Sequence, residues 1–209
     1  MSRLVTPRLF EPGTAGWTEK DLRDPDVQWH WSQGRYEWAD GVLTKMAPQG
    51  FQGILPLHRL RRILEHHLDA IGDGGEFYTE VDVLLRPGRV ARPDMIFLTA
   101  EQHRAQQQIE AQRLLADEEY RPVYVPPMLV VESVSPNHEA HDRLTKRQWY
   151  AQAKIALYWL LTAHERSLVC LNLAGDEYVE EASGKDAQTV RTGAPGGIEI
   201  PLADLWRKV

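Results

Sequence analysis

The feature that most constrains the fold is an apolar run, Met128 to Pro136, with one carboxylate at its centre. It reads Met-Leu-Val-Val-Glu-Ser-Val-Ser-Pro and carries β-branched residues in its middle. This pattern predicts a strand that is buried on both faces, as in the interior of a sheet. Burying an ionised Glu132 costs several kcal/mol unless a cation or hydrogen-bond donors compensate. The run therefore predicts both a core strand and a polar or cationic partner for Glu132.

A second carboxylate has a similar setting. Asp94 follows Pro93 at the head of the apolar run Met95 to Leu98. Two acids, each tied to its own core strand, supply the oxygen ligands that a Mg²⁺ site needs. The alternative is that each acid is only a satisfied polar residue at a strand end. The presence of the pair favours a metal site.

Length and composition predict one soluble domain with elaborations. The chain has 209 residues, of which 43% are apolar and 26% charged, and no apolar run approaches the ~20 residues that span a membrane. We expect an arm over residues 1–34 and a single domain over residues 35–209. The single Cys170 excludes an internal disulfide, and the start of the chain lacks the pattern of a signal peptide, so we expect a cytoplasmic protein. The net charge of −6 argues against nonspecific binding of nucleic acid over the whole surface, but it is compatible with a local basic face.

The first part of the chain predicts a packed arm, a hairpin and a helix. The arm should be irregular apart from a short helix and should pack three tryptophans on the domain, Trp17, Trp29 and Trp31. Asp40-Gly41 between two strand-like runs is typical of a hairpin turn. Leucines at three- and four-residue steps predict a helix from Ile54 to Ile71. His58 and Glu65 fall beside its apolar stripe and could reach a cleft, or could simply be solvated.

Alternating residues predict a strand from Phe77 to Leu85, and a turn then leads into the Asp94 strand from Val90 to Leu98. Glu80 and Asp82 lie on the polar face of the first strand. Either could be a third acid for the metal, although acids on an exposed strand face are commonly only solvated.

A helix is predicted after the central strand, from Glu139 to Lys154. On it Asp142 and Lys146 share a side with Trp149, which should face the protein, so Lys146 should point inward. The alternative is that Asp142 and Lys146 form only an i,i+4 ion pair worth ~0.3–0.5 kcal/mol. The apolar run from Ala156 to Leu161 then predicts a second buried strand.

This order of elements is typical of an α/β fold. We expect a central mixed sheet flanked by the helices that begin near Ile54 and Glu139. Its strands should be those at Phe77, Met95, Leu129 and Leu157.

The motifs resemble the restriction-endonuclease-like PD-(D/E)xK fold and, within it, the Uma-two family of proposed endonucleases. The matching pieces occur in family order and span roughly residues 36–206. They are Tyr36-Glu-x-x-Asp-Gly-x-Leu-x-Lys-Met46, His58 opening a Leu-rich helix, Arg92-Pro-Asp94, Leu129-Val-Val-Glu-Ser-Val-Ser-Pro136, Asp142-x-x-x-Lys146-x-x-x-Tyr150 and Tyr158-Trp159. The ordered set carries the resemblance, since no single piece is specific.

The resemblance implies metal-dependent hydrolysis of phosphodiester bonds, with Asp94 and Glu132 binding Mg²⁺ or Mn²⁺. Two departures bear on activity. Val134 stands where the broad fold pattern has lysine, and Lys146 of the following helix looks like its substitute. Thr162 stands where the family tends to have aspartate.

Two functions remain open from the sequence. The first is a Mg²⁺-dependent endonuclease acting on DNA, with Asp94, Glu132 and Lys146 catalytic. Supporting residues would be Asp142, His58, Glu65 and Glu80, and the DNA backbone would meet Arg86, Arg89, Arg92, Arg143 and Arg147. The second is a non-catalytic DNA-binding or protein-interaction module that keeps the nuclease fold, which Val134 and Thr162 favour. The arginines could equally be ordinary surface charge, and the sequence does not distinguish DNA from RNA.

We predict a homodimer. Cleavage of both strands needs two sites, and closed twofold dimers are the commonest soluble assembly. Light scattering at working concentration should give twice the mass of the chain, and a monomeric mass would contradict the prediction.

Overall fold

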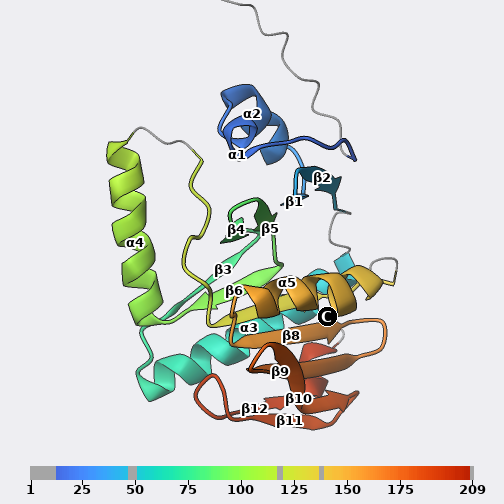
Figure 1. Ribbon diagram of the computed structural model, residues 1–209. Coiled ribbons are helices and arrows are strands. Elements are labelled where there is room, and N and C mark those ends of the chain that lie inside the picture. The colour runs from blue at the N-terminus through green and yellow to red at the C-terminus, as the bar shows by residue number, and fades with distance from the viewer. Residues whose placement is uncertain (1–12, 47–50, 117–119, 137–138, 208–209) are drawn as a thin grey trace, which may run out of the picture.

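A six-stranded mixed sheet forms the centre of the computed structural model, which describes residues 13–46, 51–116, 120–136 and 139–207 (Figure 1). Its strand order is β10 (Glu177–Lys185), β9 (Ser167–Ala174), β8 (Leu157–Thr162), β7 (Leu129–Ser133), β6 (Met95–Leu98) and β3 (Glu76–Thr79). Of the neighbouring pairs, β7 and β8 are parallel and the others are antiparallel. The predicted sheet is confirmed, with the run that carries Glu132 as an interior strand.

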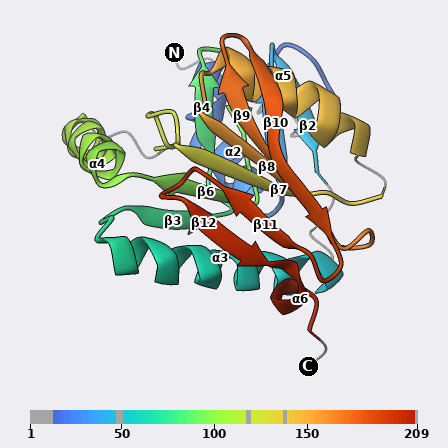
Figure 2. The ribbon, with the colours of Figure 1, turned by 90° about the horizontal axis from the view of Figure 1, so that it is seen from below.

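The long helix α3 (Phe51–Ile71) covers one face of this sheet (Figure 2). Its buried leucines recur at helical spacing and pack on β6, β7 and β8, and they are Leu57, Leu60, Leu64 and Leu68. The hairpin of β11 (Thr189–Thr192) and β12 (Ile198–Pro201), with α6 (Leu202–Leu205), completes this side of the core. The helix predicted from Ile54 is thus confirmed, and it begins slightly earlier.

The other face is covered by the helical segment that was predicted from Glu139 to Lys154. Its first turns form a π-helix, η1 (His141–Lys146), and its last turns form α5 (Arg147–Gln152). Tyr150 and Ala151 pack with residues of β6, β7 and β8 in a second core cluster. A π-turn holds one extra residue, and such turns are frequent at functional sites.

A second, four-stranded sheet lies beside the central one. Its order is β2 (Val42–Lys45), β1 (Tyr36–Ala39), β5 (Arg89–Ala91) and β4 (Val83–Arg86). The predicted hairpin turn is confirmed, because Ala39 pairs with Val42 and both Asp40 and Gly41 have positive φ. Helices α1 (Glu19–Leu22) and α2 (Pro25–Ser32) pack against this sheet.

The tryptophan prediction for the arm is only partly confirmed. Trp17 and Trp31 are buried against the second sheet, but Trp29 is 61% exposed. The helix α2 was not predicted, although Asp24 caps it and Pro25 stands at its first position. The residues before 13 lie outside the described part of the chain.

The prediction of one strand from Phe77 to Leu85 is wrong, as is that of one strand from Val90 to Leu98. Each run forms two strands that belong to different sheets, β3 with β4 and β5 with β6. Glu80 has φ of 56°, and this left-handed residue ends β3. Alternation of side chains predicts strands but cannot show where the chain crosses between sheets. The crossings bring Glu80 and Asp94 to the junction of the two sheets.

Helix α4 (Ala100–Leu115) projects from the end of β6 (Figure 1). A capping box of Thr99 and Gln102 begins it, and of its residues only Gln106 is buried. None of the helices in the described part of the chain is long and apolar enough to cross a membrane.

We predict that Gly75→Ala destabilises the fold and that Gly74→Ala does not. A Cβ at Gly75 would lie 2.4 Å from the Phe97 ring and 2.5 Å from the Leu98 carbonyl oxygen, whereas a Cβ at Gly74 would meet only Ala100 at 3.7 Å. Overpacking of this kind costs about 1–3 kcal/mol, which lowers the melting temperature by roughly 2–4 °C per kcal/mol. Equal melting temperatures for the two variants would contradict the packing of β3 on β6.

Candidate active site

Glu132 lies near the end of β7 and is only 2% exposed. Its side chain points to the same face as those of Val130 and Val134, towards the η1–α5 segment. Two donors meet its Oε1 atom, the Lys146 ammonium at 3.0 Å and the Tyr150 hydroxyl at 2.5 Å. The partners that offset the burial of this carboxylate, as the sequence required, are therefore a lysine and a tyrosine.

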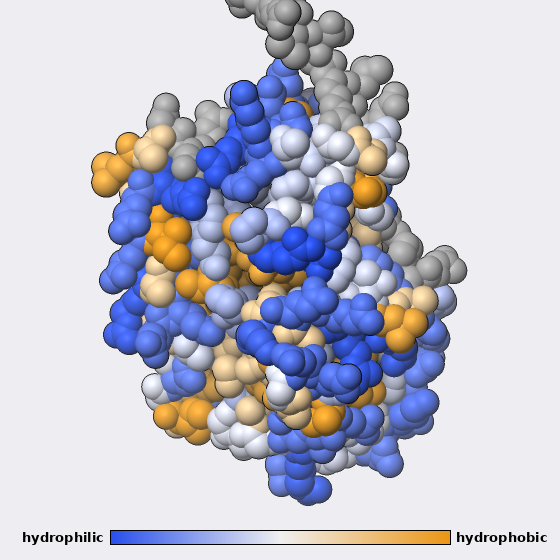
Figure 3. All heavy atoms as spheres, in the orientation of Figure 1, coloured by the Kyte–Doolittle hydropathy of each residue, from blue (hydrophilic) through white to orange (hydrophobic). Residues whose placement is uncertain are grey.

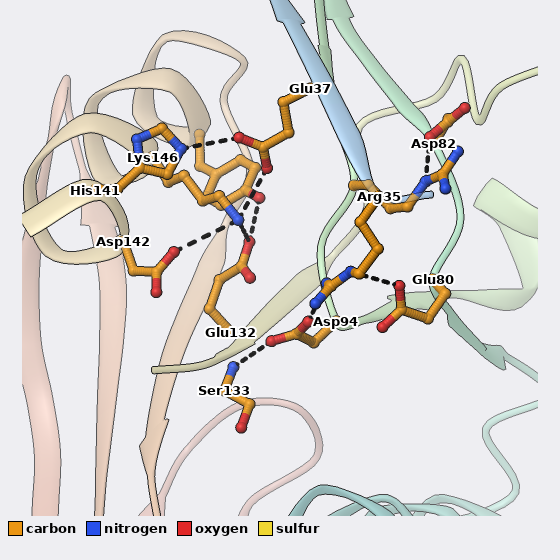
Figure 4. A network of polar contacts seen from close by, with 12 residues as sticks. Arg35, Glu37, Glu80, Asp82, Asp94, Glu132, Ser133, His141, Asp142 and Lys146 are labelled. Atoms are coloured by element: carbon orange, nitrogen blue, oxygen red, sulfur yellow. Dashed lines mark hydrogen bonds and ion pairs between the residues drawn. The ribbon is translucent and has the colours of Figure 1, made fainter. Parts of the chain in front are cut away.

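Asp94 lies beside Glu132 on the neighbouring strand. Met95 pairs with Val131, so one further step of the antiparallel register sets Asp94 opposite Glu132. Residues in such positions have Cβ atoms about 4.5–5.5 Å apart. Asp94 Oδ2 accepts a hydrogen bond from the Ser133 amide at 2.6 Å, and Oδ1 pairs with Arg35 (Figure 4). The structure thus brings together the two acids that were nominated as metal ligands.

Lys146 points inward, as predicted, and its side chain is only 3% exposed. Its ammonium lies 2.9 Å from Glu37, 3.0 Å from Glu132 and 3.5 Å from Asp142 (Figure 4). Burial alone would lower the pKa of Lys146, but these three carboxylates raise it well above its ordinary value. Lys146 is therefore a buried permanent cation, and its pair with Asp142 is the longest of its three contacts.

Glu37, from β1, is a central member of this cluster that the sequence analysis did not nominate. It is 1% exposed, and besides Lys146 it meets His141 Nε2 at 2.8 Å. Burial favours its neutral form, but Lys146 and then His141 lower its pKa below the ordinary value. The available signal was the one used for Glu132, an acid inside an apolar strand. Because β1 is so short, the sequence did not reveal that both of its faces are covered.

Arg35 links the cluster to Glu80. Its Nε lies 2.8 Å from Glu80 Oε2, and another of its nitrogens pairs with Asp94. Burial raises the pKa of Glu80, which keeps part of its side chain exposed. Asp82 turns away from this cluster and accepts from Arg92 and Trp31, both at 2.7 Å. Glu80, rather than Asp82, is thus the nominated acid that joins this cluster, and it does so through Arg35.

Negative charge exceeds positive charge in the cluster. Its carboxylates belong to Glu37, Glu80, Asp94, Glu132 and Asp142, while its permanent cations are Arg35 and Lys146. Burial raises the pKa of Glu132 well above its ordinary value and also raises that of Asp142. A buried cluster with this excess favours either added protons or a further cation.

Two nominated residues of α3 are not brought to this cluster. His58 is exposed, and Glu65 pairs with Arg61 at 2.6 Å on the same helix. Helix α3 covers the sheet face opposite to Glu132 and Lys146. Among the described residues, neither side chain contacts a member of the cluster.

The arginines nominated for DNA contact all have partners within the protein. Arg86 and Arg89 meet Asp40, Arg92 meets Asp82, Arg143 meets Thr162, and Arg147 meets the Tyr178 carbonyl. Arg89 is buried and also lies over the Trp149 ring. The side chains of Arg86 and Arg143 keep 44% and 33% exposure, whereas those of Arg89 and Arg92 keep 10% and 13%. DNA contact by the five stays a prediction.

The two departures from the family pattern have structural explanations. Val134 is buried in the same core cluster as Tyr150, so a lysine there would need a polar partner in an apolar setting. Lys146 instead brings its ammonium to Glu132 from the next helix. Thr162 is buried at the end of β8 and accepts from Arg143 at 3.3 Å.

A second group of possible metal ligands lies on the surface. Ligand atoms of Glu139, His164 and Glu165 lie within 4.8 Å of one another. Glu165 also pairs with Lys185 at 3.7 Å, so part of its charge is already neutralised. Exposed acidic groups of this kind are common without a metal. The buried cluster is the stronger candidate.

The chain is similar to known proteins in its sequence pattern and in its fold. Residues 26–203 match the model of the Uma2 family, described as "Putative restriction endonuclease". The chain belongs to the Uma2 family. A crystal structure from Anabaena variabilis ATCC 29413, described as "a putative nuclease belonging to DUF820", is similar to it with a TM-score of 0.59 and 12% identity. The similarity covers 82% of this chain and 89% of that one, and at this identity it supports the fold alone. No curated protein matches the chain.

We predict that Lys146→Met destabilises the protein far more than Lys154→Met, measured by denaturant unfolding with EDTA present. Removing one partner of a buried ion pair costs about 3–5 kcal/mol. Lys154 pairs with Asp176 at the surface, where such pairs are worth about 0–1 kcal/mol.

The loss of stability caused by Lys146→Met should depend on pH. Without the ammonium, the folded-state pKa of Glu37 rises above its unfolded value and that of Glu132, already raised by burial, rises further, so folding takes up protons. The variant then loses stability as pH rises, and its deficit against the unaltered protein is larger near about pH 8 than near about pH 5. A deficit independent of pH would contradict the assigned contacts.

Proposed function

We propose that this Uma2 protein is a metal-dependent endonuclease that hydrolyses phosphodiester bonds in DNA, with Mg²⁺ as its metal and Mn²⁺ as an alternative. The observation that carries the proposal is the placement of Asp94, just before β6, beside Glu132 of β7 and next to a buried lysine. Membership in Uma2 supports a nuclease, and the structural neighbour supports the fold.

The residues present fit a divalent metal ion. Asp94 and Glu132 offer carboxylate oxygens, the donors that Mg²⁺ prefers. Both hydrogen bonds to Glu132 fall on Oε1, so among the described residues its Oε2 has no partner. The excess of carboxylates over cations also favours a further positive charge. When bound, the metal would lower the pKa of a water ligand and neutralise charge on the phosphate.

Lys146 would act beside the metal as a fixed positive charge. Glu37 and Asp142 hold its ammonium from two sides, so its position does not depend on substrate. A preorganised cation of this kind stabilises negative charge that develops on the phosphate or orients the attacking water. Arg35 would hold Asp94 in place from the other side of the site.

The alternative is a non-catalytic DNA-binding or protein-interaction module. The saturation of Lys146 by three carboxylates favours it, as do Val134 and Thr162 at the two departures. The alternative predicts nucleic-acid or protein binding without metal-dependent cleavage, whereas the nuclease predicts both. We also propose a homodimer for the nuclease, since two strands must be cut.

The test is metal binding by calorimetry together with nicking of supercoiled plasmid in Mg²⁺ or Mn²⁺. Glu132→Gln should lower metal affinity by at least the ~10–100-fold seen when residues around a metal site are changed, and should abolish nicking. Asp176→Asn is the matched control, because Asp176 is an exposed acid that pairs only with Lys154. Unaltered protein that binds neither ion and leaves the plasmid intact would reject the nuclease in favour of the module.

A further inference from the structure

A cavity of about 590 Å³ includes in its lining Glu80, which Arg35 links to the candidate active site. Helix α2, the β3–β4 connection, α4 and the segment at 120–123 line it. Figure 1 shows this segment returning from α4 towards β4, and Figure 3 shows apolar surface near α4 among hydrophilic side chains. The volume of the cavity is within the usual range for small-molecule sites. Glu80 lines the cavity and also pairs with Arg35, which holds Asp94, so the cavity adjoins the reacting centre.

Two pairs of aromatic rings line this cavity. Trp31 and Tyr120 meet edge to face with centroids 6.4 Å apart, while Tyr78 and His103 lie 6.0 Å apart at a shallow angle. The Tyr78 hydroxyl and His103 Nδ1 are joined by a hydrogen bond of 3.0 Å, which fixes both rings. Trp31 is only 2% exposed, so the ring surface that a ligand could meet belongs to Tyr78, His103 and Tyr120. Flat, rigid rings at the wall of a cavity favour a flat aromatic ligand, because they stack on it at little entropic cost.

The polar groups of the cavity suit a ligand that donates hydrogen bonds. Glu80 and Glu110 contribute carboxylates, while the Arg92 charge is already paired with Asp82. The Tyr120 hydroxyl is buried near Asp82 without a hydrogen bond of normal geometry to any described residue. Arg121 also lines the cavity and is exposed. The carboxylates of Glu80 and Glu110 disfavour a phosphate group next to them. An aromatic ring with amino groups would find acceptors for its N–H donors.

We propose that this cavity binds one unpaired nucleobase of the substrate strand while the adjoining phosphate lies at Asp94 and Glu132. The inference rests on the proposed nuclease function and names its substrate class. A base can enter only if it is unpaired or flipped out of a duplex, which costs a few kcal/mol in paired DNA. The protein therefore prefers single strands, or strands with unpaired bases, over perfect duplex. Bases with amino groups bind better than thymine.

The experiment uses a pair of neighbouring exposed residues on α4. Gln107 lines the cavity and Gln108 does not. Gln107→Trp should fill the cavity, while Gln108→Trp adds the same bulk one step around the helix and serves as the control. Binding of a short labelled oligonucleotide is measured by fluorescence anisotropy in Ca²⁺. Single strands of DNA and RNA, perfect duplex, and a single strand of abasic sites are compared.

Stacking of one base contributes about 1–3 kcal/mol, so Gln107→Trp should weaken single-strand binding by roughly 5- to 150-fold. The penalty should disappear on the abasic strand, and Gln108→Trp should bind like the unaltered protein. Equal binding by the two variants, or equal penalties on the normal and abasic strands, would overturn the cavity assignment. If Gln107→Trp weakens the binding of single-stranded DNA and RNA equally, this supports a site that contacts the base and not the sugar.

Failure of the cavity assignment is distinguishable from failure of the nuclease. Plasmid nicking together with equal binding by Gln107→Trp and Gln108→Trp would reject the cavity alone. If Gln107→Trp selectively weakens single-strand binding but the unaltered protein does not nick plasmid, the base site is kept and catalysis is rejected. An unaltered protein that binds none of the strands would reject both.

Discussion

The candidate site depends on the ion pair between Lys146 and Glu132 in the interior. A buried carboxylate in the central sheet would be unstable alone, and the lysine compensates it from the covering helix. Glu37 adds a third charge from the second sheet, so the same ammonium joins all three layers. This contact joins the second sheet to the central one, and the remaining acids and Arg35 are arranged around it.

The interior of the central sheet was predictable because β6, β7 and β8 are short apolar runs. Glu132 was predictable for a related reason, since a charge in such a run demands a partner. The second sheet was not, because strand periodicity is local and carries no information about which sheet a strand joins. Glu80 illustrates this, since a left-handed residue inside an alternating run changes the sheet without disturbing the pattern.

Part of the candidate site escaped the sequence analysis for the same reason. Arg35 and Glu37 lie far from Asp94 and Glu132 along the chain, and only the docking of the two sheets brings them together. His58 and Glu65 illustrate the opposite error. Their helix does pack on the central sheet, but on the face away from Lys146, and helical periodicity does not determine which face of a sheet a helix covers.

The π-helix η1 limits which changes in chain length can preserve the contacts of Lys146. Each helical residue turns the chain by about 100°, and a π-turn contains one residue more than an α-turn. Loss of one residue from His141–Lys146 would keep the helix intact yet rotate its N-terminal part relative to its C-terminal part. Asp142 and Tyr150 would then no longer both face the Lys146–Glu132 pair. Related chains that share this site must therefore have the same number of residues between His141 and Lys146. A chain that has the lysine but lacks one residue of this turn would form a different site.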